Sequence, residues 1–158
     1  MMAKYTREEC KQRAEFLNKP AADWEVADLA GKPHALKHYH GKVVVMDFWY
    51  RGCGWCMRAM PQVNRLAHDF QDRPVAFLGM NTDRQSSDAE LVVKLMDLGY
   101  PVLKAEGLPK KYGVQGFPTM IIIDQEGVIR DVHVGYTPTL YHDVAEIVQG
   151  LLNNKNTK

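Results

Sequence analysis

Apolar residues gather in short runs along this 158-residue chain, and polar or amphipathic stretches separate the runs. The most continuous run covers residues 43–49. It is rich in β-branched and aromatic side chains, which predicts a strand buried on both faces of a sheet. Residues 74–80 and 119–123 predict two more strands. Residues 128–134 predict a fourth, and the turn sequence at 124–127 joins it to the third as a hairpin.

Three stretches between and after these strands have apolar residues at helical spacing. The first covers about residues 53–70. The second is expected to begin at the capping box of residues 87–90 and to end at Gly99. In the third, Thr137 is expected to cap the helix and Pro138 to occupy its first position.

The first forty residues predict two smaller units. A capping box at residues 6–9 begins a short helix that runs to about Leu17. Residues 24–26 and 34–36 flank a polar turn, which predicts a β-hairpin ahead of the buried strand.

Strands that alternate with helices, followed by a hairpin and a last helix, are typical of a three-layer α/β fold around a mixed sheet. The length fits one domain with a sizeable core. We therefore expect an N-terminal helical extension at 1–19, one α/β domain at 20–153 and a disordered tail at 154–158.

The composition is that of an ordinary globular protein, with 46% hydrophobic residues, 25% charged residues and a formal net charge of +1. So small a net charge produces no global field that would attract nucleic acid or anionic lipid. No apolar stretch approaches the roughly 20 residues that a membrane-spanning helix needs. We expect a monomer with no nucleic-acid partner and no membrane-spanning segment.

The most informative chemistry lies in two of the three cysteines, Cys53 and Cys56. Their spacing, at the junction between a strand and a helix, allows a disulfide to close with little movement of the backbone. The helix N-terminus lowers the pKa of the first thiol, and the thiolate is the nucleophile of disulfide exchange. Cys53 should therefore attack, and Cys56, one turn into the helix, should be the resolving thiol. Cys10 has no partner at a useful spacing.

The pair by itself is also compatible with an inert disulfide or with half of a zinc site. A zinc site needs two more ligands, and the only closely spaced histidines, His38 and His40, come before the buried strand. We therefore expect no metal here and expect both histidines to be solvated.

Asp47 lies inside the buried strand, six residues before Cys53. Strand alternation places its side chain on the face opposite Phe48, beneath the helix that carries the cysteines. Burial raises the pKa of such a carboxyl group, so Asp47 could take a proton from Cys56 and return it in the reverse reaction. The alternative is an edge aspartate that caps a turn, but a carboxylate inside an apolar strand is costly to bury.

Together these features resemble the thioredoxin superfamily over most of the chain. The residues that match are Asp47-Phe48-Trp49, Cys53-Gly54-Trp55-Cys56, Pro61 in the following helix, and the segment 111–119 with its Phe117-Pro118-Thr119. The stretch at 24–42 and the insert between Asn81 and Leu108 resemble the TlpA/ResA-like thiol-disulfide oxidoreductases of bacteria.

The resemblance implies a thioredoxin-like fold with an N-terminal β-hairpin extension and a helical insert. It also implies a protein-disulfide oxidoreductase that exchanges a Cys53–Cys56 dithiol or disulfide with protein thiols and disulfides through a mixed disulfide at Cys53. The catalytic residues would be Cys53, Cys56 and Asp47. Such an enzyme needs no cofactor and works with a redox partner that the sequence leaves unidentified.

We expect a substrate-binding surface made of Gly54, Trp55, Phe117 and Pro118, of which the resemblance implies the last two. Pro118 would follow a cis peptide bond and pack against the disulfide. The Phe117 backbone would hold an extended substrate segment by strand-like hydrogen bonds.

Among the departures from the thioredoxin pattern, two bear directly on the redox chemistry. Thioredoxin has Gly-Pro between its cysteines, whereas this chain has Gly54-Trp55. Potentials of this fold span about −270 to −120 mV, so a reducing and an oxidising role both stay open. Thioredoxin also has a lysine near its buried aspartate on the next strand, and we expect the matching residue here to be Phe77. Asp47 should then be less compensated and should titrate well above a free aspartate.

Two other functions are compatible with such a fold. A peroxiredoxin-like thiol peroxidase needs a Pro-x-x-x-Thr/Ser-x-x-Cys loop, and residues 47–52 supply neither the proline nor the hydroxyl. A non-catalytic thioredoxin-like adaptor would usually lack a cysteine or the proline, and this chain keeps Cys53, Cys56 and Pro118.

The location of the protein depends on where the native chain begins. The first ten residues are polar and do not resemble a signal peptide. A native start at Met1 would favour the cytoplasm. TlpA/ResA-like proteins are usually exported or membrane-anchored, so a trimmed chain would favour the cell envelope.

Overall fold

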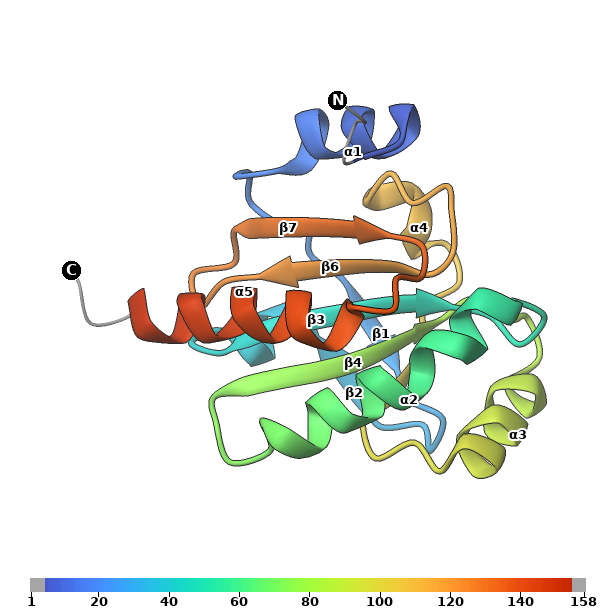
Figure 1. The fold of residues 1–158 in the computed structure, drawn as a ribbon. Helices are drawn as coiled ribbons and strands as arrows, with labels where there is room; N and C mark the ends of the chain where they lie inside the picture. Colours follow the sequence, from blue (N-terminus) through green and yellow to red (C-terminus); the bar gives the residue numbers. More distant parts are fainter. Residues whose placement is uncertain (1–4, 155–158) are drawn as a thin grey trace.

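A five-stranded mixed sheet runs through the centre of the protein, and helices cover both of its faces (Figure 1). The computed structural model describes residues 5–154. The strand order is β5-β4-β3-β6-β7, in which β3, β4 and β5 are parallel and β6 and β7 are antiparallel to their neighbours. The bounds are β3 Val43–Trp49, β4 Val75–Asn81, β5 Val102–Lys104, β6 Thr119–Ile123 and β7 Ile129–Val134. The expected fold class is confirmed.

The central strand is β3, as its apolar run predicts. All seven of its residues are buried, and it pairs with β4 on one edge and β6 on the other. A strand with neighbours on both edges and packed layers on both faces has no contact with water, which explains why apolar residues fill it.

Alternate residues of β3 point into two separate cores. Val43 and Val45 pack against α2 and α5, which lie together on one face of the sheet (Figure 1). Met46 and Phe48 pack into the opposite layer, which contains residues of η1 and α4. The helices are α1 Arg7–Phe16, η1 Leu36–Tyr39, α2 Gly54–Asp69, α3 Ser86–Met96, α4 Leu108–Lys111 and α5 Leu140–Asn154.

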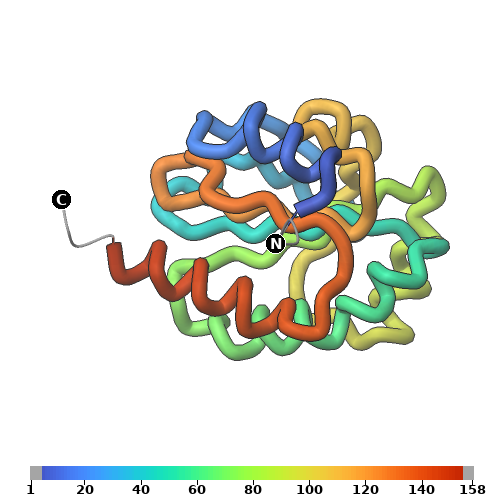
Figure 2. The backbone as a smooth tube through the Cα atoms, turned by 45° about the horizontal axis from the view of Figure 1, so that its top comes forward, coloured from blue at the N-terminus to red at the C-terminus, as the bar shows by residue number. Residues whose placement is uncertain are grey.

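Both N-terminal units form where the sequence predicted them. β1 (Glu25–Ala27) and β2 (Pro33–Ala35) pair antiparallel as a separate two-stranded sheet. The hydroxyl of Thr6 accepts a hydrogen bond from the Glu9 N–H at 3.1 Å and caps α1. α1 lies against β7, the last strand of the sheet (Figure 2).

The bounds of α3 differ from the prediction. The helix begins at Ser86 and no side chain caps it, so the capping box predicted at 87–90 does not form. The helix ends before Asp97, which adopts the left-handed conformation with φ of 49°, and not at Gly99. Aspartate tolerates this conformation better than most residues do, and it therefore terminates the helix earlier than a glycine rule predicts.

The start of α5 also differs. Leu140 is its first residue, and Pro138 lies in the turn before it. The hydroxyl of Thr137, the predicted cap, is buried and has no hydrogen-bond partner in the described chain. The Thr139 hydroxyl instead donates to the Asp143 carboxylate at 2.9 Å, inside the first turn.

The last described residue, Asn154, still belongs to α5, although the sequence placed it in a tail. The remainder of that predicted tail, 155–158, lies outside the described residues. Within residues 5–154, no helix is both long and apolar enough to span a lipid bilayer.

Candidate active site

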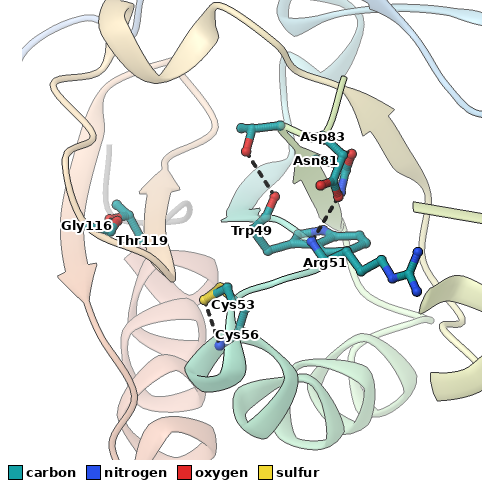
Figure 3. The surroundings of a disulfide bond; sticks show 9 residues. Trp49, Arg51, Cys53, Cys56, Asn81, Asp83, Gly116 and Thr119 are labelled. Atoms are coloured by element: carbon teal, nitrogen blue, oxygen red, sulfur yellow. Dashed lines mark hydrogen bonds between the residues drawn. A yellow bond between two sulfur atoms is a disulfide. The ribbon is translucent and has the colours of Figure 1, made fainter. Parts of the chain in front are cut away.

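Cys53 and Cys56 form a disulfide at the start of α2 (Figure 3). Their Cα atoms are 5.2 Å apart. Cys53 is the N-cap residue of the helix, and its sulfur accepts a hydrogen bond from the Cys56 N–H at 3.1 Å. This N–H and the positive end of the helix dipole would stabilise negative charge on the Cys53 sulfur once the disulfide is reduced. Cys53 is 6% exposed and Cys56 only 1%, so an incoming group reaches Cys53 first.

Residues at the end of β4 hold the short loop between β3 and the disulfide by hydrogen bonds. The Arg51 N–H donates to the Asp83 carboxylate at 2.9 Å, and the Asn81 amide donates to the same carboxylate at 2.9 Å. The Arg51 guanidinium points away from the two sulfurs (Figure 3) and pairs with Asp88 at 2.7 Å. Arg51 therefore positions the loop rather than placing its charge at Cys53.

Asp47 lies on the face of β3 that α2 covers, in the same row as Val43 and Val45. It is 3% exposed, and its Oδ1 has no hydrogen-bond partner within residues 5–154. Burial raises the pKa of Asp47 to about 7. A carboxyl group with such a pKa can accept and release a proton near neutral pH.

The residue that pairs with Asp47 on the next strand is Gly79, and Phe77, two residues earlier on β4, lies on the same face of the sheet. In the parallel register of β3 and β4, Asp47 pairs with Gly79. A Cβ at Gly79 would lie 3.0 Å from Trp49 Nε1 and 3.2 Å from Tyr100 Cε2, so a side chain there would require these two neighbours to move. An apolar strand carries no mark of its register, so the sequence did not point to Gly79 as the partner of Asp47. Because glycine brings no positive charge, the expectation of an uncompensated Asp47 still holds.

The segment that enters β6 lies across from the disulfide (Figure 3). The peptide bond between Phe117 and Pro118 is cis, as the resemblance implies. The Thr119 hydroxyl donates to the Gly116 carbonyl at 2.6 Å, and the Gly135 N–H donates to the buried Pro118 carbonyl at 2.7 Å. Phe117 is half-buried and packs against the cluster that contains both cysteines.

Aromatic side chains flank the disulfide. Trp55, between the two cysteines, is 57% exposed and stacks on Tyr136 with the ring centroids 5.9 Å apart. The Arg58 guanidinium lies 5.6 Å from the Trp55 ring centroid and 5.8 Å from that of Tyr136. Tyr50 packs edge-on against Phe117 at 5.2 Å.

The sequence did not single out Tyr136, Arg58 or Tyr100. Arg58 follows Trp55 by three residues on a helix, a spacing at which side chains meet, so that contact could have been predicted. Tyr136 follows β7 and Tyr100 precedes β5, and no local pattern connects either residue with the cysteines.

The histidines considered as zinc ligands lie away from the cysteines. His38 lies in η1 and His40 follows it, in the layer on the other face of the sheet, and both are exposed. Among residues 5–154, no three His, Cys, Asp or Glu side chains form a group that could hold a metal ion.

Residues 17–132 match the sequence pattern of the AhpC/TSA family. The thiol-disulfide oxidoreductase ResA of Bacillus thuringiensis is 33% identical over 131 residues, which cover 81% of this chain and 73% of the relative. The thioredoxin-like protein YneN of Bacillus subtilis is 32% identical over 119 residues, which cover 73% of this chain and 69% of the relative.

Solved structures share the fold. A crystal structure from Chlorobium tepidum, described as a candidate thiol:disulfide interchange protein DsbE, matches with a TM-score of 0.80 and 26% identity over 86% of this chain and 97% of that chain. The thioredoxin domain of a thiol-disulfide oxidoreductase from Bacteroides vulgatus matches with a TM-score of 0.74 and 27% identity, over 84% of this chain and 97% of that chain.

Proposed function

This chain belongs to the AhpC/TSA family, has thiol-disulfide oxidoreductases among its relatives, and on this basis we propose that it exchanges disulfides with protein substrates. One observation carries the proposal. Cys53 and Cys56 are bonded at the N-terminus of α2, with Cys53 as the cap and the more exposed of the two.

The first step in the reducing direction is attack by the Cys53 thiolate on one sulfur of a substrate disulfide. A mixed disulfide forms between Cys53 and that sulfur. The second substrate sulfur leaves as a thiolate and takes up a proton from water. The helix N-terminus stabilises the charge on the attacking sulfur before the bond forms.

In the second step Cys56 gives its proton to the Asp47 carboxylate and attacks the Cys53 sulfur. The mixed disulfide breaks, the first substrate sulfur leaves as a thiolate, and the Cys53–Cys56 disulfide forms. Two electrons pass from the enzyme dithiol to the substrate disulfide. The raised pKa of Asp47, about 7, suits a group that takes a proton in one direction and returns it in the other.

The reverse sequence oxidises a substrate dithiol. In either direction a second dithiol or disulfide, the redox partner, returns the Cys53–Cys56 couple to its starting state. The reduction potential of the couple decides which direction operates, because a difference of 30 mV corresponds to about 1.4 kcal/mol.

We also propose that Gly54, Trp55, Phe117 and Pro118 bind the substrate. The exposed Trp55 ring offers apolar surface beside the sulfurs. The backbone at Phe117 offers strand-like hydrogen bonds to an extended segment. The stack of Trp55 on Tyr136 under Arg58 adds two residues to this surface.

Trapping the mixed disulfide tests the proposal. Cys10 is free and exposed, so both variants carry Cys10→Ser. The reduced Cys56→Ser variant should form a covalent adduct with insulin that mass spectrometry detects and dithiothreitol reverses. The matched Cys53→Ser variant should form none and should lose insulin reduction. An adduct with Cys53→Ser alone would reverse the roles of the two cysteines.

The same assays separate the alternative functions. A wild-type protein that reduces no insulin with dithiothreitol as donor, and traps no adduct, would be an adaptor. A wild-type protein that consumes hydrogen peroxide much faster than it reduces insulin would be a thiol peroxidase.

A further inference from the structure

Three buried polar atoms beneath the disulfide lack hydrogen-bond partners in the described chain. They are Asp47 Oδ1, Trp49 Nε1 and the Tyr100 hydroxyl. Their residues are 3%, 0% and 7% exposed. Buried polar groups in proteins are nearly always hydrogen-bonded, because desolvation without a partner is costly. Three such atoms in one region therefore need a common explanation.

All three lie around Gly79. Asp47 pairs with Gly79 across the β3–β4 ladder, and Trp49 follows Asp47 by two residues and so shares its face. A Cβ added to Gly79 would lie 3.0 Å from Trp49 Nε1 and 3.2 Å from the Tyr100 ring. The glycine thus lets the indole and the phenol approach the strand beside Asp47.

The elements packed around Asp47 bring few other titratable groups. α2 brings Cys56 and Cys53, which form the disulfide. α5 brings Tyr141, whose hydroxyl donates to the Asp69 carboxylate. The facing residues of β4 and β6 are uncharged: Phe77 and Gly79, and Met120 and Ile122. Two cations of α2 lie over neighbouring rings, and both are exposed: Arg58 lies over Trp55 and Tyr136, and Arg65 lies over Tyr141.

We propose that Trp49 and Tyr100 hold one buried water against Asp47, and that Tyr100 is a positioning residue for the proton transfer from Cys56. The inference rests on the proposed role of Asp47. A water that accepts from the Trp49 N–H and the Tyr100 hydroxyl can donate to Asp47 Oδ1, which satisfies all three atoms. Donors directed at a carboxylate favour its charged form. In this site the water, held by Trp49 and Tyr100, takes the place of the lysine that thioredoxin has near its buried aspartate.

The Tyr100→Phe variant removes one oxygen and tests the inference. NMR titration of the Asp47 carboxyl carbon should give a pKa about one pH unit higher than in the wild type, because a hydrogen bond to the charged form is lost. The pH midpoint for resolution of the mixed disulfide should rise by the same amount.

Tyr112→Phe is the matched control. Tyr112 is also buried, but it packs into the core on the opposite face, and its hydroxyl donates to the Ala22 carbonyl. Its loss should lower stability and leave both the Asp47 pKa and the pH midpoint unchanged. If removing any buried hydroxyl had this effect, both variants would change the Asp47 pKa and the pH midpoint. A change in Tyr100→Phe alone therefore reports a specific role of Tyr100.

The outcomes separate this inference from the proposed function. An unchanged Asp47 pKa in Tyr100→Phe, while Asp47→Asn removes the pH dependence of resolution, overturns the role of Tyr100 alone. An Asp47→Asn variant with the wild-type rate and pH dependence overturns the role of Asp47. If Tyr100→Phe does not fold, the wild type carries the test: its Trp49 indole N–H should show an NMR cross-peak to a long-lived water, and a missing cross-peak contradicts the inference.

Discussion

The carboxyl group of Asp47 is the one charged side chain in a strand that is otherwise apolar. Burial raises its pKa to about 7 in the folded protein, against about 3.9 in an unfolded chain. Between these two values the folded state binds more protons than the unfolded state. The contribution of Asp47 to the free energy of unfolding therefore falls as the pH rises from about 4 to about 7, and stays low above that range.

Asp47→Asn should for this reason stabilise the protein at high pH. We expect its free energy of unfolding to exceed that of the wild type by on the order of 4 kcal/mol at pH 8, and the difference to vanish near pH 4. Urea denaturation of the oxidised proteins at both pH values measures this. The exposed Asp72→Asn should stay within about 0.5 kcal/mol of the wild type at both. A difference for Asp47→Asn that does not depend on pH would contradict the raised pKa.

At the scale of elements, α1 is attached to the sheet mainly by polar side chains. β7 is an edge strand, and edge strands present unpaired backbone groups. The Glu9 carboxylate accepts the Val134 N–H at 3.2 Å. Arg13 donates to the Val132 carbonyl at 2.6 Å and pairs with Asp131 at 2.8 Å. The helix thus covers the edge and satisfies its backbone, although it lies outside the part that matches the family.

Arg13→Ala should release much of this attachment. Asp131 is 9% exposed and would lose its cationic partner, so we expect a loss of about 1–3 kcal/mol in the free energy of unfolding. Denaturant titration measures it. Lys11→Ala, on an exposed position of the same helix, is the control and should change stability by less than about 0.5 kcal/mol. Equal effects of both variants would mean that the ion pair contributes nothing.

At the scale of the whole molecule, the surface around the disulfide draws on four separate segments. Tyr50 follows β3, Trp55 lies on α2, Phe117 precedes β6 and Tyr136 follows β7. The topology explains this convergence. The carboxyl ends of β3 and β7 lie beside the amino end of the antiparallel β6, so all four segments meet at this end of the sheet.

Tyr136→Ala should weaken substrate binding without changing the chemical step. Loss of the ring that supports Trp55 should raise KM for insulin about 3- to 10-fold and leave kcat nearly unchanged. Steady-state kinetics with dithiothreitol as donor measures both constants. Leu95→Ala, at a 72% exposed position on α3, is the control and should leave both unchanged. A fall in kcat at constant KM would instead place Tyr136 in the chemical step.

The features that the sequence predicted well are those that depend on near neighbours in the chain. The strand at 43–49 follows from an unbroken apolar run, and the capping of α1 follows from residues three apart. Each helix boundary that was predicted wrongly depends on the conformation of a single residue. Asp97 adopts the left-handed region, and Thr137 turns its hydroxyl into the interior instead of toward the α5 backbone.

By itself, the sequence determined the fold class and a pair of thiols at a helix N-terminus, with an acid in the strand before it. These follow from periodicity and short spacings. Only the tertiary structure decided that Asp47 pairs with Gly79, and that Tyr100 and Tyr136 approach the site. Strand register and the meeting of distant segments are set by packing across the sheet, and no local pattern in an apolar strand records them.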